Sequence, residues 1–138
     1  MIIRPATQQD AERVWELLGQ MGALFVPNRD AFDRNYPTLI DSDDELLLVA
    51  EAEGEVVGYA LTVFSTLLYT NGLSAQLQEL VVDETNRQKG TGRALVKAVE
   101  AECIGRDAAQ LVVATRRAAG FYDRLGYYIS ADYLKRTF

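Results

Sequence analysis

The sequence predicts a single α/β domain that covers residues 1–138. The chain has 138 residues, 49% of them hydrophobic and 25% charged, which is the size and composition of one ordinary globular domain. No internal repeat, low-complexity tract or Gly/Ser/Pro-rich linker marks a boundary. Segments of β-rich composition alternate with segments of helical periodicity, and their predicted order is βααβββαβαββ.

The first two predicted elements are a short strand and a capped helix. Ile2 to Arg4 are typical of a strand, which Pro5 ends. Thr7 is a suitable N-cap for the helix that follows, and Gly19 and Gly22 end that helix. Its apolar residues are Val14, Trp15, Leu17 and Leu18.

A second helical segment is expected from about residue 29 to residue 40. It carries apolar residues at helical spacing, namely Phe32, Tyr36 and Leu39. Because proline lacks an amide hydrogen and clashes with the preceding turn, Pro37 is expected to interrupt this helix.

Two tight turns join the next three predicted strands. Leu46 to Ala52 and Val56 to Leu68 are β-rich, and Glu53-Gly54-Glu55 joins them as a hairpin. Asn71-Gly72 then predicts a second tight turn that leads into a strand from Ala75 to Val82.

The remaining elements alternate between helix and strand. Thr91 to Ile104 has one apolar face and one charged face, as in an amphipathic helix. Ala109 to Ala114 is a short apolar strand, and Arg117 to Leu125 is a helix closed by Gly126. Tyr127 to Phe138 is expected to form a terminal pair of strands.

Charge and cysteine content limit the function classes. A net charge of −6 disfavours nucleic acid or an anionic membrane as the main partner. The first residues lack the features of a signal peptide and no apolar stretch is long enough to span a bilayer, so a cytoplasmic location is expected. The single cysteine, Cys103, cannot form an internal disulfide and is expected to be a buried small residue.

The chain contains no histidine. This absence excludes every mechanism that needs imidazole as a base, an activator of a nucleophile or a metal ligand. A catalytic base must then be a carboxylate, a tyrosine or ordered water. No segment has the acidic spacing of a calcium loop, so no metal is expected.

A glycine-rich basic loop follows the strand that ends at Val82 and opens the next helix, in the stretch LQELVVDETNRQKGTGRAL. Gly90 and Gly92 allow backbone amides to approach a ligand closely, and the helix start favours an anion. Arg87, Lys89 and Arg93 bring three cations to the same place. The loop therefore indicates a polyanionic ligand such as a pyrophosphate, or else a glycine turn with solvated basic neighbours.

The loop matches neither the three-glycine Rossmann fingerprint nor the P-loop. Arg87-Gln88-Lys89-Gly90-Thr91-Gly92 resembles the signature R/Q-x-x-G-x-G/A of the GNAT superfamily of N-acetyltransferases. The preceding LQELVVDE and the later AAGFYDRLGY, with Arg117 before it, resemble further parts of this family. The resemblance implies a mixed, mostly antiparallel sheet flanked by helices.

The resemblance also implies a binding site for acetyl-CoA as cosubstrate. In this family the fourth and fifth strands splay apart and the pantetheine arm lies between them, paired with the backbone of the fourth strand. Many relatives have an asparagine seven residues before the motif tyrosine, where this chain has a threonine whose hydroxyl could serve instead. The implied coenzyme contacts are Leu80, Val81, Val82, Arg87, Gln88, Lys89, Gly90, Thr91, Gly92, Arg93 and Thr115.

Two residues are implied to be catalytic. Tyr122 matches the family's general acid, which protonates the departing thiolate, although the same residue could be a packed helix aromatic. An alkyl amine must lose a proton before it attacks the thioester, and Glu79 is the best candidate for the base, acting directly or through water. Glu79 could equally be an outward-facing strand residue. Asp83 and Glu84 are the reserve candidates.

The sequence thus predicts direct transfer of an acetyl group from acetyl-CoA to a primary amine of a small molecule or peptide, in a ternary complex. The alternative is a non-catalytic acetyl-CoA-binding regulatory or interaction module, and a homodimer stays open. The acceptor is expected between residues 22–29 and the final strands, lined by Phe25, Phe32 and Tyr133.

Overall fold

The computed structural model describes residues 1–22, 24–115 and 118–138. Its five strands form one sheet in the order β1-β2-β3-β4-β5. The strands are β1 (Ile2–Pro5), β2 (Glu45–Ala52), β3 (Glu55–Leu67), β4 (Gly72–Val82) and β5 (Leu111–Val113). The helices are η1 (Gln8–Asp10), α1 (Ala11–Leu18), α2 (Arg29–Asp41), η2 (Glu84–Asn86), α3 (Thr91–Gly105) and α4 (Ala119–Arg124).

The sheet is mixed. β1 to β4 pair antiparallel with their neighbours, whereas β5 runs parallel to β4. The parallel pair requires a crossover, which α3 supplies between β4 and β5. The predicted mixed, mostly antiparallel sheet is confirmed.

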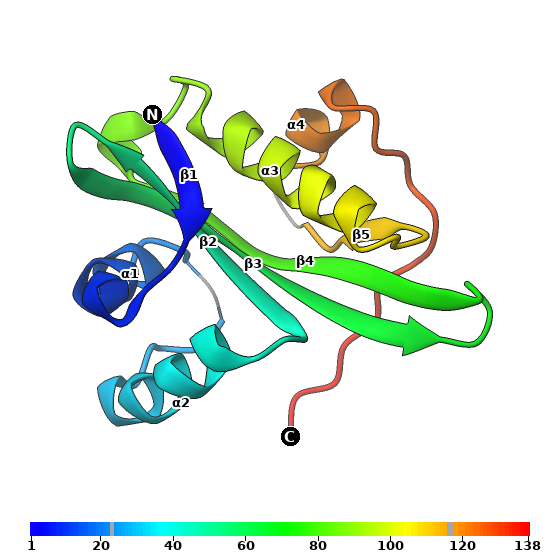
Figure 1. The fold of residues 1–138 in the computed structure, drawn as a ribbon, viewed down its shortest axis with the longest axis horizontal. Helices are drawn as coiled ribbons and strands as arrows, with labels where there is room; N and C mark the ends of the chain where they lie inside the picture. The colour runs from blue at the N-terminus through cyan, green and yellow to red at the C-terminus, as the bar shows by residue number, and fades with distance from the viewer. Residues whose placement is uncertain (23, 116–117) are drawn as a thin grey trace.

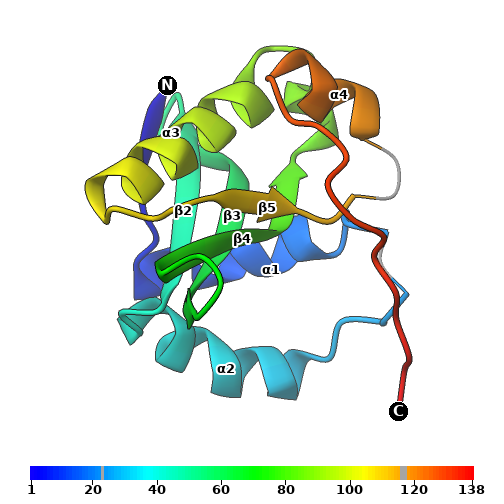
Figure 2. The same cartoon turned by 90° about the vertical axis from the view of Figure 1, so that its right-hand side faces the viewer.

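The helices cover both faces of the sheet (Figures 1 and 2). On one face, called the α3 face here, Leu95, Val96 and Val99 of α3 are completely buried against the sheet. On the other, called the α1 face, Val14 and Leu17 of α1 pack against strand residues. Cys103 is buried on the α3 face, as predicted.

Both predicted tight turns are present. Glu53 and Gly54 have φ of 53° and 77° between β2 and β3, the paired left-handed conformations of a two-residue hairpin loop. Asn71 has φ of 61° at the start of β4. These turns set the β2-β3-β4 meander to which the site is attached.

The expected interruption at Pro37 is wrong. α2 continues through Pro37 to Asp41. The Asn28 side chain accepts a hydrogen bond from the Ala31 amide at 2.9 Å and caps the helix start. Tyr36, buried on the α1 face, donates from its hydroxyl to the Thr7 carbonyl at 2.7 Å. Tertiary packing outweighs the cost of the missing amide hydrogen.

The expected terminal strands are also wrong. Residues 127–138 contain no strand. All side chains from Tyr128 to Phe138 are exposed, so residues of high β-propensity find no pleated surface to pack on. Tyr127 instead donates a hydrogen bond to Glu100 of α3 at 2.9 Å. The helix expected from Arg117 is α4, which begins at Ala119, and Arg117 lies outside the described residues.

Candidate active site

The centre of the candidate site is an open stretch of β4. β5 pairs with β4 only over Ala75 to Leu77, and beyond Leu77 the described strands leave that edge of β4 unpaired. In the pairing of β4 with β3, Thr62 lies opposite Leu77 and the preceding Leu61 lies opposite Glu79. Gln78 therefore has no partner on β3 and forms a β-bulge at the point where β4 and β5 separate.

The backbone of β4 alternates between its two edges. The amide of Asp83 donates to the Val57 carbonyl of β3 at 2.8 Å. Because the backbone groups of successive strand residues point to opposite edges, this bond shows to which edge the N–H and C=O groups of each preceding residue point. Leu80 and Val82 therefore direct their backbone groups to the open edge, whereas Val81 directs its groups to β3. In agreement, Arg87 Nε reaches the Val82 carbonyl from the open side at 3.1 Å.

The glycine-rich loop lies at the end of this edge and leads into α3. Gly90 is the N-cap of α3 with φ of 83°, a left-handed conformation that favours glycine. As a glycine, Gly90 has no side chain with which to cap this helix start. The amides of its first turn are thus available to an anion. Thr91 is buried beneath the turn, while Gln88 and Lys89 are exposed.

The basic residues of the loop face solvent. Arg87, Lys89 and Arg93 are exposed, and none of them takes part in the salt bridges that the described residues form. Their charge is not neutralised by a neighbouring carboxylate there. The three cations and the uncapped helix start make this end of the molecule attractive to a polyanion.

Gly92 lies where the first turn of α3 meets α4 and β4. A Cβ atom at this position would lie 3.4 Å from the Phe121 ring and 3.8 Å from the Val82 side chain, which are ordinary van der Waals distances. The space beside Gly92 therefore accommodates a methyl group, but a larger side chain would meet the Phe121 ring.

Tyr122 is positioned by α4 on the α3 face. Its side chain is buried and makes edge-on ring contacts with Phe121 and Tyr127, with centroids 5.0 and 5.7 Å apart. Burial raises the pKa of Tyr122 to about 12, so its hydroxyl stays protonated at neutral pH. Among the described residues the hydroxyl has no hydrogen-bond partner, although the ring is well packed.

Glu79 lies on the α1 face. Its carboxylate accepts a hydrogen bond from the Tyr59 hydroxyl at 2.8 Å. Burial of Tyr59, reinforced by the adjacent Glu79 charge, raises the pKa of the phenol. Tyr59 therefore remains a donor that holds the carboxylate in place without protonating it. Glu79 is a half-buried, oriented carboxylate, not a freely solvated strand residue.

The reserve candidates have other partners. Asp83 accepts hydrogen bonds from the Thr85 amide at 3.1 Å and hydroxyl at 3.0 Å, and pairs with Arg13. The Thr85 amide, followed by Arg13, lowers the pKa of Asp83, so this carboxylate is a weak base. Glu84 is exposed and its amide donates to Gln20 Oε1 at 3.1 Å.

Thr115 lies between β5 and α4. Its Oγ1 accepts a hydrogen bond from the Ala118 amide at 3.1 Å, at the start of α4. The hydroxyl hydrogen is not consumed by this bond and stays available as a donor.

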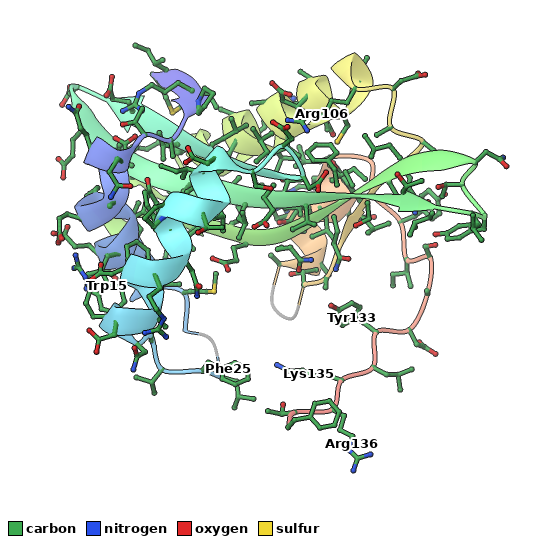
Figure 3. The ribbon with its side chains drawn as sticks, turned by 60° about the horizontal axis from the view of Figure 1, so that its bottom comes forward. Trp15, Phe25, Arg106, Tyr133, Lys135 and Arg136 are labelled. Atoms are coloured by element: carbon green, nitrogen blue, oxygen red, sulfur yellow. The ribbon has the colours of Figure 1, made fainter. Side chains whose placement is uncertain are left out.

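The predicted acceptor-lining residues divide into two groups. Phe32 is half-buried between Trp15 and Tyr36 on the α1 face, at centroid distances of 5.4 and 5.2 Å, and so packs against the core. Phe25 is exposed and lies against Lys135 of the terminal segment, with Nζ 5.3 Å from the ring centroid (Figure 3). The two predicted segments thus meet, although the terminal one is not a strand.

Tyr59 is the site residue that the sequence did not reveal. Regular pairing continued from the second turn would place Tyr59 opposite Leu80, whereas the bulge at Gln78 shifts the pairing so that Tyr59 lies opposite Val81, two residues from Glu79 on the same face. The sequence carries no signal of this shift. Side chains on adjacent strands at such diagonal positions are within reach of each other when one is long.

Neither a membrane span nor a metal cluster is found in the described parts of the chain. No helix there is long and apolar enough to cross a membrane. No three potential metal ligands gather within residues 1–22, 24–115 and 118–138.

A family model described as an acetyltransferase (GNAT) domain matches residues 43–129, more than half of the chain. The chain belongs to this GNAT acetyltransferase family. The matched region runs from β2 to α4 and includes the open β4 edge, the glycine-rich loop and Tyr122. GNAT domains use acetyl-CoA. No curated protein sequence matches the chain significantly.

Solved structures share the fold over nearly the whole chain. A transcriptional regulator from Bacillus halodurans is 22% identical, with a TM-score of 0.88 and 99% of both chains covered. A glucosamine-6-phosphate N-acetyltransferase from Arabidopsis thaliana is 22% identical, with a TM-score of 0.87 and 99% of this chain and 97% of that chain covered. A ribosomal-protein-alanine N-acetyltransferase from Brucella melitensis is 20% identical, with a TM-score of 0.80 and 99% and 100% covered.

Proposed function

We propose that this GNAT domain binds acetyl-CoA and transfers its acetyl group directly to a primary amine of a small molecule or peptide. The observation that carries the proposal is the open β4 edge, which ends at an uncapped, basic helix start. The edge offers hydrogen-bonding backbone groups, and the helix start offers amides and cations for phosphate.

The residues present fit acetyl-CoA, which supplies an activated acyl group and a thiol leaving group. The backbone of Leu80 and Val82 would bind the pantetheine amides as an added strand does. For Val82 this requires the Arg87 side chain to leave the carbonyl that it bonds in this structure. The amides of the α3 start, with Lys89 and Arg93, would bind the pyrophosphate.

Glu79 and Tyr122 divide the proton transfers. Glu79 accepts a proton from the ammonium group of the acceptor, and the neutral amine then attacks the thioester carbonyl. The nitrogen–carbon bond forms and the carbon–sulfur bond breaks, while Tyr122 donates its proton to the departing thiolate. The second proton, which the amine nitrogen loses as it becomes an amide, passes through water to the Tyr122 phenolate and restores the phenol. The buried phenol, with its raised pKa, suits this donor role because it is protonated at neutral pH. No acyl-enzyme intermediate is needed.

The test is a screen of amines for release of free thiol from acetyl-CoA. The panel begins with glucosamine 6-phosphate and a peptide with amino-terminal alanine, because the named activities of two fold relatives concern these groups. Amine-dependent thiol release with a matching acetylated product supports the proposal. Tight acetyl-CoA binding in calorimetry without turnover across the panel favours the non-catalytic module instead.

A further inference from the structure

A hollow lies on the α1 face of the sheet, beside the candidate active site. It has a volume of about 270 Å³ and is lined by β3, β4 and β5 and the segments that flank them. Its polar lining residues are Ser65, Tyr69, Ser74, Gln76, Gln78 and Gln110. These residues are called the glutamine groove below.

The glutamine groove has a neutral lining that is partly polar and partly apolar, the apolar part being Val63, Leu67, Ala75 and Val112. None of the described residues that line it is charged. Gln110 Nε2 donates to the Tyr69 hydroxyl at 2.9 Å and to Ser74 Oγ at 3.0 Å, which fixes one end of the groove. Gln76 makes only a long contact of 3.5 Å with the Tyr133 hydroxyl, and exposed Gln78 makes no hydrogen bond to described residues. Two amide groups are thus available for a ligand.

The groove adjoins Glu79 on the same face of the sheet. Tyr59 of β3 bonds Glu79, and Val63 and Ser65, which lie four and six residues further along β3, line the groove. Because alternate strand residues share a face, Tyr59, Val63 and Ser65 point to the same side. Gln78, the bulge residue, also lines the groove and immediately precedes Glu79.

We infer that the glutamine groove holds the body of the acceptor, and that this acceptor is a small monoamine with a hydroxylated, uncharged body. This inference rests on the proposed function and names its substrate class. The amine lies at Glu79, whose carboxylate is oriented by Tyr59 and has no ion-pair partner among the described residues. The hydroxyl groups of the acceptor bond Gln76 and Gln78. A groove of about 270 Å³ is smaller than sites for drug-sized ligands, which start at roughly 300 Å³. A single sugar-sized ring suits it.

The neutral lining disfavours three other classes of amine. A polyamine would need a second carboxylate for its second ammonium group, and none is found among the described residues that line the groove. A phosphorylated amine would need a cation, which the described lining also lacks. A purely apolar amine would cover Gln76 and Gln78 without replacing the hydrogen bonds that they make with water, and such unpaired amides are costly.

The test compares four amines of different chemical classes. Glucosamine carries one amine and several hydroxyls, and cyclohexylamine has a ring of the same size without hydroxyls. Glucosamine 6-phosphate adds a phosphate, and spermidine is a linear polyamine without hydroxyls. The readout is kcat/KM for thiol release at saturating acetyl-CoA. The groove variants are Gln76→Leu and Gln78→Leu, and the matched control is Gln9→Leu, an exposed glutamine on η1.

We expect glucosamine to exceed each of the other three amines at least tenfold. We expect each groove variant to lower kcat/KM for glucosamine roughly three- to tenfold, the effect of about one lost hydrogen bond. Cyclohexylamine turnover should rise, because the substitution removes an amide that the apolar ring leaves unpaired. The KM for acetyl-CoA should stay unchanged, and Gln9→Leu should match the unaltered protein. Equal or better turnover of any other amine, or groove variants that affect all amines alike, would overturn the inference while the proposed function stands.

A binding measurement keeps the inference testable if no amine is acetylated. Saturation-transfer NMR detects glucosamine on the acetyl-CoA-bound protein without any turnover. Transfer to the sugar protons that is weakened by Gln76→Leu but not by Gln9→Leu supports the groove. Absence of transfer, or transfer indifferent to both substitutions, overturns it. Failure of the proposed function is separately visible as tight acetyl-CoA binding without thiol release.

Discussion

The two sides of β4 prepare the candidate site in different ways. On the side of the loop and α3, the important groups are backbone amides and carbonyls, positioned by a short β5, a bulge at Gln78 and a left-handed Gly90. On the α1 face, the important groups are side chains, and one hydrogen bond from Tyr59 separates an oriented Glu79 from an ordinary strand residue. The comparison teaches that ligand binding on the first side is weakened by side chains that block access to the backbone, whereas the chemistry on the second side is weakened by removing single side-chain atoms.

The same contrast separates two carboxylates four residues apart. Asp83 is held by Thr85 and Arg13 at the end of β4, whereas among the described residues Tyr59 alone holds Glu79. The charge of Asp83 is therefore used for structure, and that of Glu79 is available for chemistry. The following predictions test these differences, from the largest expected effect to the smallest.

Replacement of Tyr122 by Phe should have the largest effect. It removes one hydroxyl from a well-packed ring, so we expect turnover to fall roughly ten- to a thousandfold while acetyl-CoA affinity is retained. Steady-state kinetics and calorimetry measure the two quantities. Tyr127→Phe is the matched control, since that hydroxyl is bonded to Glu100 on α3. Full activity in Tyr122→Phe would exclude the general-acid role.

Replacement of Glu79 by Gln should lower turnover about ten- to a hundredfold at neutral pH without weakening acetyl-CoA binding. Turnover should partly recover at high pH, because more of the amine is already deprotonated and the base is needed less. A pH profile of thiol release for both proteins measures this recovery. A profile parallel to that of the unaltered protein would assign the base to another residue or to water.

Replacement of Gly92 by Val should weaken acetyl-CoA binding about tenfold, or about 1.4 kcal/mol. The branched side chain would meet the Phe121 ring and reduce the space for a ligand at the start of α3. The double variant Gly92→Val, Phe121→Leu separates two causes, since it relieves the packing conflict but leaves the added side chain near the ligand. Calorimetry should show the affinity loss in both variants, and full rescue by Phe121→Leu would assign Gly92 to packing alone.

Replacement of Asp83 by Asn should reduce the free energy of unfolding by about 1–3 kcal/mol at neutral pH, because a charged acceptor of several hydrogen bonds is lost. The pKa of Asp83 is lowered in the folded protein, so its contribution to stability is present above the unfolded value of about 3.9 and is lost as pH falls through the folded pKa. The unaltered protein should therefore lose part of its advantage over Asp83→Asn below about pH 4. Urea unfolding at several pH values measures this, and a difference independent of pH would count against it.

Salt should have the smallest effect. If Arg87, Lys89 and Arg93 contact phosphates, raising salt from about 50 to 500 mM should weaken acetyl-CoA binding a few-fold, because screening weakens exposed ion pairs. The acceptor KM in the neutral groove should change less. A calorimetric titration that is flat in salt would remove these cations from the coenzyme site.

The sequence predicted those parts of the molecule where local pattern and packing agree. Both hairpins were predicted from the turn residues Gly54 and Asn71. The glycine-rich basic loop before α3 was predicted from its glycines and cations. Pro37 was misjudged because burial of Tyr36 and the Asn28 cap outweigh one lost hydrogen bond. The terminal strands were misjudged because β-propensity does not provide a surface to pack on.

Side-chain geometry was the part that sequence could not supply. The hydrogen bond from Tyr59 to Glu79 joins residues that are 20 positions apart in the chain, and the ion pair of Arg13 with Asp83 joins residues that are 70 positions apart. The bulge at Gln78, which brings Gln78 beside Glu79 at the groove, leaves no distinctive residue pattern. Such features depend on register, and a register is decided by the whole sheet.

The short pairing of β5 with β4 also bears on how the free protein behaves at high concentration. An unpaired strand edge can pair with a strand of another molecule, and the described strands leave the stretch of β4 beyond Leu77 unpaired on this edge. The Arg87 side chain covers one carbonyl of it, at Val82. A bound coenzyme would occupy the same backbone groups, so it would protect the protein from self-association as well as take part in the reaction.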